Sequence, residues 1–219
     1  MAGKMKVGVL ISGRGSNLKS LLEACATPGF PAEIVTVLSN RPGAGGLDHA
    51  RAAGVAAAVV DHKAYDGRAA FEAALTTALE DAAVELVCLA GFLRVVTPPF
   101  VRHWQGRMIN IHPSLLPLFP GLDTHARALA AGVKLHGCSV HYVSEEVDGG
   151  AIVGQAAVPV LAGDDPDSLA ARVLAAEHRL YPACLRLVAD GRARLVDGKV
   201  EISLDGDGAA QIFNPPLRP

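Results

Sequence analysis

The sequence places an asparagine and a histidine at a spacing that could serve acyl-transfer chemistry. Asn110 lies within a short apolar run, residues 108–111, that predicts a buried strand, and His112 ends it. Residues two apart on a strand share a face, so the amide and the imidazole should project together. An amide N–H can stabilise a developing oxyanion, and an imidazole can move a proton near neutral pH. The alternative is a core strand with a hydrogen-bonded buried amide and a histidine at its rim.

A third candidate, Asp148, precedes Gly149 and Gly150 in a turn-forming stretch. A carboxylate beside an imidazole favours the protonated ring, so Asp148 could complete an acid–base pair with His112. Taken alone, Asp148 is better explained as an ordinary turn aspartate. Because the sequence has no Gly-x-Ser-x-Gly nucleophile motif, transfer would pass directly between two substrates without a covalent enzyme intermediate.

A glycine-rich turn near the N-terminus suggests an anion site. Residues 12–18, Ser-Gly-Arg-Gly-Ser-Asn-Leu, follow a predicted strand at 6–11 and open an amphipathic helix that runs to about residue 27. This geometry points free backbone N–H groups at an anion. Leu18 replaces the third glycine of the dinucleotide motif and the P-loop lysine is missing, so a single phosphate monoester is favoured. The alternative is a tight turn in which Ser16 or Asn17 caps the helix.

Elsewhere the chain alternates apolar strands with helices. Strands are predicted at 34–38, 57–60 and 86–90, and helices at 47–53, 68–82 and 98–103. Continuous apolar strands between helices are typical of a parallel sheet covered on both faces. Residues 91–96 follow a strand and could wall a pocket for a flat ring, or simply lead into the next helix.

The C-terminal half has a different pattern. After a short helix at 125–131, strands at 135–143 and 151–158 flank an Asp-Gly-Gly turn and should pair antiparallel. A long helix at 168–189, with Asp167 or Ser168 as N-cap, precedes a small hairpin around Asp197-Gly198 and a tail. We therefore predict an α/β fold with an open, mostly parallel twisted sheet, helices on both faces and an antiparallel C-terminal part. Residues 1–189 should form one domain, followed by a hairpin and tail at 190–219.

Bulk properties exclude several classes of protein. The net charge of the 219 residues is −2 with no basic stripe, which argues against a nucleic-acid partner. No apolar run approaches the roughly 20 residues of a membrane helix, and the first one is too short for a signal peptide. The four cysteines are dispersed, and His136 and His141 would face opposite ways on one strand, so we expect no metal. A cytoplasmic protein with buried, reduced thiols is predicted.

Five segments carry a family resemblance that spans residues 6–189. In order and spacing they resemble the glycinamide ribonucleotide formyltransferases. The core at 110–117 is shared by folate-dependent formyltransferases generally, whereas the glycine-rich loop implies a phosphorylated acceptor. The segments are Ser12-Gly13-x-Gly15-Ser16-Asn17-Leu18, Leu89-Ala90-Gly91-Phe92-x-Arg94, Asn110-Ile111-His112-Pro113-Ser114-Leu115-Leu116-Pro117, Pro120-Gly121 and Asp148-Gly149-Gly150.

This resemblance implies a Rossmann-like fold and a reaction in de novo purine biosynthesis. The formyl group of 10-formyltetrahydrofolate, a co-substrate, would pass to the amine of glycinamide ribonucleotide through a tetrahedral intermediate. Asn110 would donate to the oxyanion, His112 would transfer protons, and Asp148 would hold and tune His112. The implied acceptor-binding residues are Gly15, Ser16, Asn17 and Glu177. The implied folate-binding residues are Arg68, Leu93, Arg94, Val95, Val96, Asn110, Ser144, Glu145, Glu146, Val147 and Asp148.

Two departures and three alternatives accompany the resemblance. Arg14 stands where some members carry Asn, and Leu118 where a Lys is common. A methionyl-tRNA formyltransferase is disfavoured because about thirty residues after Ala189 are too few for a tRNA-binding domain. A formyltetrahydrofolate hydrolase would carry an extra N-terminal domain, and a noncatalytic binding module would not need the His112–Asp148 pair. The expected assembly is a monomer or weak homodimer.

Overall fold

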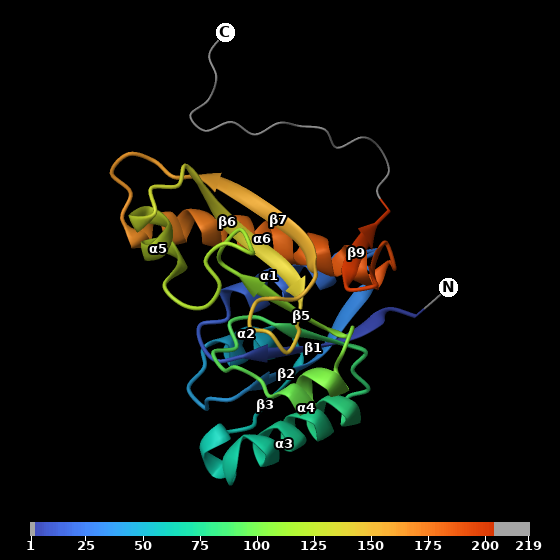
Figure 1. Ribbon diagram of the computed structural model, residues 1–219. Coiled ribbons are helices and arrows are strands. Elements are labelled where there is room, and N and C mark those ends of the chain that lie inside the picture. Colours follow the sequence, from blue (N-terminus) through green and yellow to red (C-terminus); the bar gives the residue numbers. More distant parts are fainter. Residues whose placement is uncertain (1–2, 204–219) are drawn as a thin grey trace.

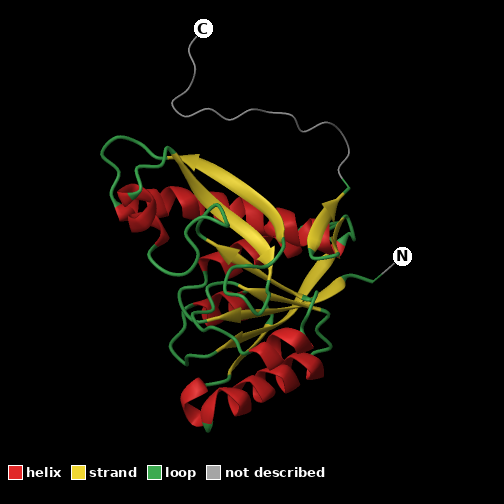
Figure 2. Cartoon of the chain, in the orientation of Figure 1, coloured by secondary structure: helices red, strands yellow, loops and turns green. Residues whose placement is uncertain are grey.

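The computed structural model describes residues 3–203, which form a seven-stranded sheet with helices on both faces (Figures 1 and 2). The strand order is β3-β2-β1-β4-β5-β6-β7. The first five strands in sequence run parallel, and β6 and β7 add antiparallel pairs, as the sequence predicts. The strands are β1 (Met5–Ile11), β2 (Ala32–Ser39), β3 (Ala56–Val59), β4 (Leu86–Leu89), β5 (Met108–His112), β6 (Leu135–Tyr142) and β7 (Ile152–Pro159).

The helices divide between the two faces of the sheet, each over its own apolar core (Figure 1). One face carries α1 (Ser16–Cys25), α2 (Gly46–Ala52) and the long α6 (Pro166–Ala189), against which the short α5 (Thr124–Ala130) packs. The other carries α3 (Gly67–Asp81) and α4 (Pro98–His103), with a 3-10 turn at His62–Ala64 before α3. A separate hairpin, β8 (Ala193–Val196) and β9 (Lys199–Ile202), follows α6.

Successive side chains of strand β5 point to opposite faces of the sheet. Ile109 and Ile111 belong to the core under α6, whereas Met108 joins the core under α3 and α4. Asn110 and His112 therefore point to the same face as Met108. The apolar core on that face contains no described residue of β6 or β7. Loops rather than helices therefore border this part of the sheet. That gap in the helical layer is where the polar side chains project.

One predicted boundary is wrong. The N-cap of α6 is Asp165, whose side chain accepts the Ser168 N–H at 2.7 Å while Ser168 Oγ accepts the Asp165 N–H at 3.0 Å. Pro166 at the first helical position fixes a helical φ and has no N–H to satisfy, so the helix begins before Asp167. Ser168 is the third residue of the helix and completes a capping box.

Other expectations of the sequence agree with the structure. All four cysteines are buried and free. The hairpin around Asp197-Gly198 is present, while the predicted tail after residue 203 lies outside the described residues. Between residues 3 and 203, no helix combines the length and the apolar character needed to cross a bilayer.

Candidate active site

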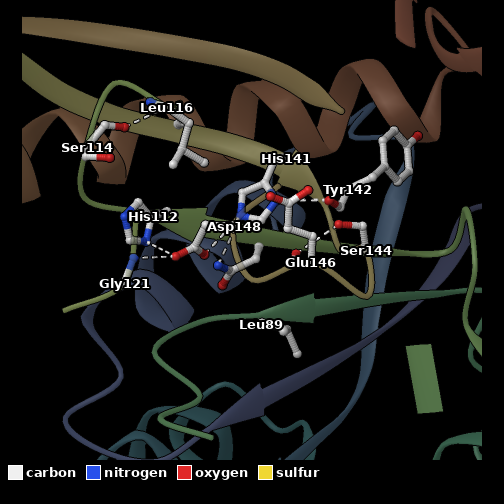
Figure 3. A network of polar contacts seen from close by, with 12 residues as sticks. Leu89, His112, Ser114, Leu116, Gly121, His141, Tyr142, Ser144, Glu146 and Asp148 are labelled. Carbon is white, nitrogen blue, oxygen red and sulfur yellow. Dashed lines mark hydrogen bonds and ion pairs between the residues drawn. The ribbon is translucent and has the colours of Figure 1, made fainter. Parts of the chain in front are cut away.

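A histidine from β5 and an aspartate from the loop after β6 meet on the open face of the sheet. His112 Nδ1 lies 3.4 Å from Asp148 Oδ2, and both side chains are nearly buried. Figure 3 shows the Asp148 carboxylate between the rings of His112 and His141. The expected pair is thus brought together from segments 36 positions apart (148 − 112).

The second nitrogen of His112 fixes the orientation of the ring. His112 Nε2 lies 3.1 Å from the carbonyl oxygen of Phe119, and a carbonyl can only accept, so Nε2 carries a proton. Nδ1 is then the ring nitrogen that faces the Asp148 carboxylate. The Asp148 carboxylate is itself held by the N–H of Gly121 at 2.8 Å. The His112 ring is thus held between a carboxylate on one side and a carbonyl on the other.

His141 is a site residue that the sequence analysis did not identify. Its Nδ1 donates to the carbonyl of Tyr142 at 2.9 Å, and its Nε2 lies 3.3 Å from Asn110 Nδ2. Burial lowers the pKa of His141, so the neutral ring accepts a hydrogen bond from the Asn110 amide. Asn110 and His141 lie opposite each other where β5 pairs with β6. No local sequence pattern indicates that these two residues are neighbours.

The chemical consequence concerns the direction of the Asn110 amide. With one N–H of the amide used by His141, the side chain is oriented and its second N–H remains available to a ligand. An oriented amide donor, an imidazole and a carboxylate around one point are the parts that stabilise an oxyanion and transfer a proton. These are the groups that direct transfer of an acyl group would require.

The glycine-rich loop lies at the carboxyl end of β1. Gly15 is the N-cap of α1 with φ 76°, and no side chain caps the helix, so the alternative of a Ser16 or Asn17 cap is wrong. A Cβ at Gly15 would stand 2.5 Å from the Cα of Gly46, which shows how closely the loop packs on α2. The uncapped N–H groups at the start of α1 suit an anion.

Glu177 reaches this loop from α6. The Asn17 amide donates to Glu177 Oε2 at 2.7 Å, and both side chains are buried. Burial raises the pKa of Glu177, and the hydrogen bond from Asn17 opposes that shift. The structure thus brings together Asn17 and Glu177, two predicted acceptor residues that stand 160 positions apart.

The predicted folate loops border the same open face. The Leu93 N–H donates to Ser12 Oγ at 2.8 Å, and the Thr97 N–H donates to the buried Glu72 at 2.9 Å, so the segment 93–97 is anchored at both ends. Across the site, the Ser144 hydroxyl donates to the Glu146 carbonyl at 2.9 Å. Several large apolar side chains of the surrounding loops are more than half exposed, which favours an apolar ligand between the loops. They are Leu93, Val95, Leu118, Leu122 and Val147.

The remaining predicted residues lie at the edge of this region. The Arg94 guanidinium lies 5.3 Å from the centre of the Phe71 ring, and Arg68 is one helical turn before Phe71. Arg68 is exposed. Glu145 is tied to Arg102 of α4 by an ion pair of 2.7 Å. These charges rim the apolar loops.

Possible metal-ligating side chains do not cluster in the part of the chain that the structure describes. There, no group of three or more His, Cys, Asp or Glu side chains could hold a metal ion. His136 and His141 point to opposite faces of β6, as their spacing predicts. Burial, and secondarily the neighbouring His125, lowers the pKa of His136 to about 4.

The fold and the site together define a formyl transferase. Residues 5–185 match the sequence model described as "Formyl transferase", and the chain belongs to that family. It is 46% identical, over 87% of its length and 90% of the relative, to the phosphoribosylglycinamide formyltransferase of Escherichia coli K12.

Two further relatives bear on the architecture. The crystal structure of glycinamide ribonucleotide transformylase 1 from Symbiobacterium toebii superposes with a TM-score of 0.89 at 48% identity, covering 92% of this chain and 95% of that one. The trifunctional purine biosynthetic protein adenosine-3 of Gallus gallus is 50% identical over 198 residues. This chain spans about a fifth of the length of that trifunctional relative.

Proposed function

We propose that this chain is a phosphoribosylglycinamide formyltransferase. It transfers the formyl group of 10-formyltetrahydrofolate to the amine of glycinamide ribonucleotide, giving formylglycinamide ribonucleotide and tetrahydrofolate in purine biosynthesis. The observation that carries the proposal is the cluster of Asn110, His112 and Asp148, in which His141 lies between Asn110 and Asp148. The chain that holds this cluster matches 90% of the length of the E. coli enzyme.

The acceptor side of the site supports a phosphorylated amine. The backbone of Gly15, Ser16 and Asn17 opens α1 without a side-chain cap, which suits the 5-phosphate of the acceptor. Glu177, buried beside Asn17, presents a carboxyl group that suits a ribose hydroxyl. Arg14 is exposed in the same loop and adds a positive charge there.

The donor side fits a flat folate ring with an anionic tail. Leu93, Val95 and Val147 are exposed apolar side chains on facing loops, and Ser144 to Asp148 offers backbone groups to the ring edge. Arg68 and Arg94 supply the positive charge that a glutamate tail needs. Lined by apolar loops and rimmed by arginines, this side of the site matches the chemistry of the co-substrate.

The site residues divide the steps of a direct transfer. The acceptor amine attacks the formyl carbon, and the second N–H of Asn110 donates to the oxygen that becomes an oxyanion. His112 takes up the proton that the amine loses, and Asp148 stabilises the imidazolium. His112 then returns a proton to the departing folate nitrogen as its bond to the formyl carbon breaks. No residue forms a covalent bond to the substrate.

The molecular context is part of the proposal. We assign residues 1–189 to one formyltransferase unit, whose N-terminal half binds the phosphate and whose C-terminal half binds folate. The hairpin and tail at 190–219 follow it. We expect a monomer or weak homodimer in the cytoplasm that binds neither nucleic acid nor membrane.

One assay tests this function. Purified protein is incubated with 10-formyltetrahydrofolate with and without glycinamide ribonucleotide, and tetrahydrofolate release is followed. The proposal predicts turnover only with the acceptor. Turnover without the acceptor would identify a hydrolase, and folate binding without turnover would identify a binding module.

A further inference from the structure

One four-residue segment, residues 119–122, touches both members of the His112–Asp148 pair. The Phe119 carbonyl accepts from His112 Nε2 at 3.1 Å, and the Gly121 N–H donates to Asp148 Oδ2 at 2.8 Å. The imidazole and the carboxylate come from different parts of the chain, yet each is oriented by this one segment. A shift of the segment would change the geometry of the pair.

The segment holds a conformation that needs outside support. Phe119 has φ 54° and the adjoining Asp123 has φ 56°, both in the left-handed region that side chains disfavour. Leu122 is 80% exposed and Pro120 is exposed, so within the segment it is Phe119 that packs against the apolar core. Such a backbone persists only where surrounding contacts over-determine it.

Arg127 supplies contacts to three of the four residues. Its Nη1 donates to the carbonyl of Pro120 and, at 3.2 Å, to the carbonyl of Leu122. Its guanidinium carbon lies 5.6 Å from the centre of the Phe119 ring. The fourth residue, Gly121, is the one that binds Asp148. Nη1 carries two N–H groups, one for each carbonyl, while the planar guanidinium lies near the ring; a lysine ammonium lacks this planar fork.

The base of Arg127 is fixed by the fold. Its backbone N–H donates to the Asp123 carbonyl at 3.0 Å in the first turn of α5. The next residue, Ala128, is fully buried where α5 packs on α6. The Phe119 ring also lies near His136 of β6, with 5.9 Å between the two ring centres. Arg127 thus connects a rigid helix to the strained segment.

We infer that Arg127 is a positioning residue for the transfer reaction, acting through residues 119–122 on His112 and Asp148. The inference rests on the proposed function, because it concerns the same imidazole–carboxylate pair. Arg127 is exposed and has no part in the phosphate or folate loops. Its loss should therefore slow the chemical step and leave substrate affinity intact.

The test compares Arg127→Ala and Arg127→Lys with Arg186→Ala. Arg186 is the matched control, because its guanidinium also lies over an aromatic ring, 4.6 Å from Phe30, but at the far end of α6. Arg127→Ala should lower kcat about ten-fold with KM for both substrates within two-fold, because misplacement by about 1 Å costs up to about 10² in rate. Arg127→Lys should be intermediate, and Arg186→Ala should match wild type.

A second readout is independent of turnover. The His112 Nε2 proton, protected by the Phe119 carbonyl, should give a low-field imidazole signal in proton NMR that disappears in His112→Gln. Arg127→Ala should broaden or lose this signal and Arg186→Ala should keep it. An unchanged signal with kcat within two-fold of wild type would overturn the inference, as would a raised KM with unchanged kcat. If the wild type shows no acceptor-dependent turnover, the proposed function fails and the NMR comparison alone decides the role of Arg127.

Discussion

The acceptor loop and the transfer site are built in two different ways. Gly13 to Leu18 is contiguous in sequence, and its backbone passes from β1 through a left-handed Gly15 into α1, with α2 and Glu177 of α6 packed against it. The transfer site instead joins β5, β6, the 119–122 segment and the turn at Asp148. In the proposed function, anion binding rests mainly on local backbone geometry, whereas the transfer chemistry rests on contacts between distant segments. Changes in the first region should alter acceptor binding, and changes in the second should alter turnover.

The largest effect is expected for His112→Ala. Loss of a group that transfers protons should lower kcat by roughly 10² to 10⁴ with little change in acceptor KM. Steady-state kinetics with both substrates checks this. His103→Ala is the control, since His103 is exposed on α4 and pairs with Glu80 away from the site. A His112→Ala enzyme with near wild-type kcat would remove the histidine from the mechanism.

Asn110→Ala should have the next largest effect. Removing one donor to the oxyanion costs on the order of 10² to 10³ in kcat. His141→Ala should lower kcat less, because the amide survives and loses only the partner that orients it. Rate measurements on the two variants should show a larger loss of kcat for Asn110→Ala than for His141→Ala. The reverse order would assign the direct contact to His141.

Gly15→Ala sharpens the comparison from the other region. The added methyl group would meet Gly46 at 2.5 Å in a backbone with φ 76°, so the loop must shift. We expect acceptor KM to rise about ten-fold or more while kcat changes little, since only binding of the phosphate is disturbed. A dephosphorylated acceptor should lose affinity for the wild type and show a smaller further loss with Gly15→Ala. Equal losses in both proteins would remove phosphate binding from this loop.

The smallest effect concerns Glu177 and the pH dependence of stability. Burial raises its pKa in the folded protein above the unfolded value near 4.5, so the folded state binds this proton more tightly. Stability from this group is present below that unfolded value and is lost as the pH rises through the raised pKa. Glu177→Gln, always neutral and still able to accept from Asn17, should raise Tm at pH 7 but not at pH 4.

Thermal unfolding of both proteins across that pH range checks the prediction. Each kcal/mol of relief corresponds to about 2–4 °C in Tm for a chain of this size. Acceptor KM should rise in the same variant if the carboxylate binds the ribose. A Tm gain that persists unchanged at pH 4 would show that Glu177 is not the titrating group.

What the sequence could predict follows the same division. Local sequence patterns predict the apolar strands, the turn at Gly15 and the shared face of Asn110 and His112. The structure agrees with these predictions. His141 was missed because only the β5–β6 register places it opposite Asn110, and register is not visible in one sequence. The predicted N-cap of α6 was wrong because Pro166 starts the helix earlier than its apolar pattern suggests.

The segment 119–122 shows a further limit of sequence reasoning. Its loop composition indicates a turn, but nothing local shows that Phe119 accepts from His112 or that Gly121 donates to Asp148. Phe119 has a left-handed backbone, and its ring lies near Arg127 of α5 and His136 of β6, which no local pattern relates to it. Tertiary contacts of this kind decide the site, and only the three-dimensional structure displays them.

The central claim is that the imidazole of His112 and the carboxylate of Asp148 act as one unit. A double-mutant cycle on kcat, with His112→Ala, Asp148→Asn and the two combined, tests it most directly. Residues that act as a unit give strongly non-additive losses, so the double variant should lose about as much rate as His112→Ala alone. Losses that multiply in the double variant would show that the two groups act independently and would contradict the account.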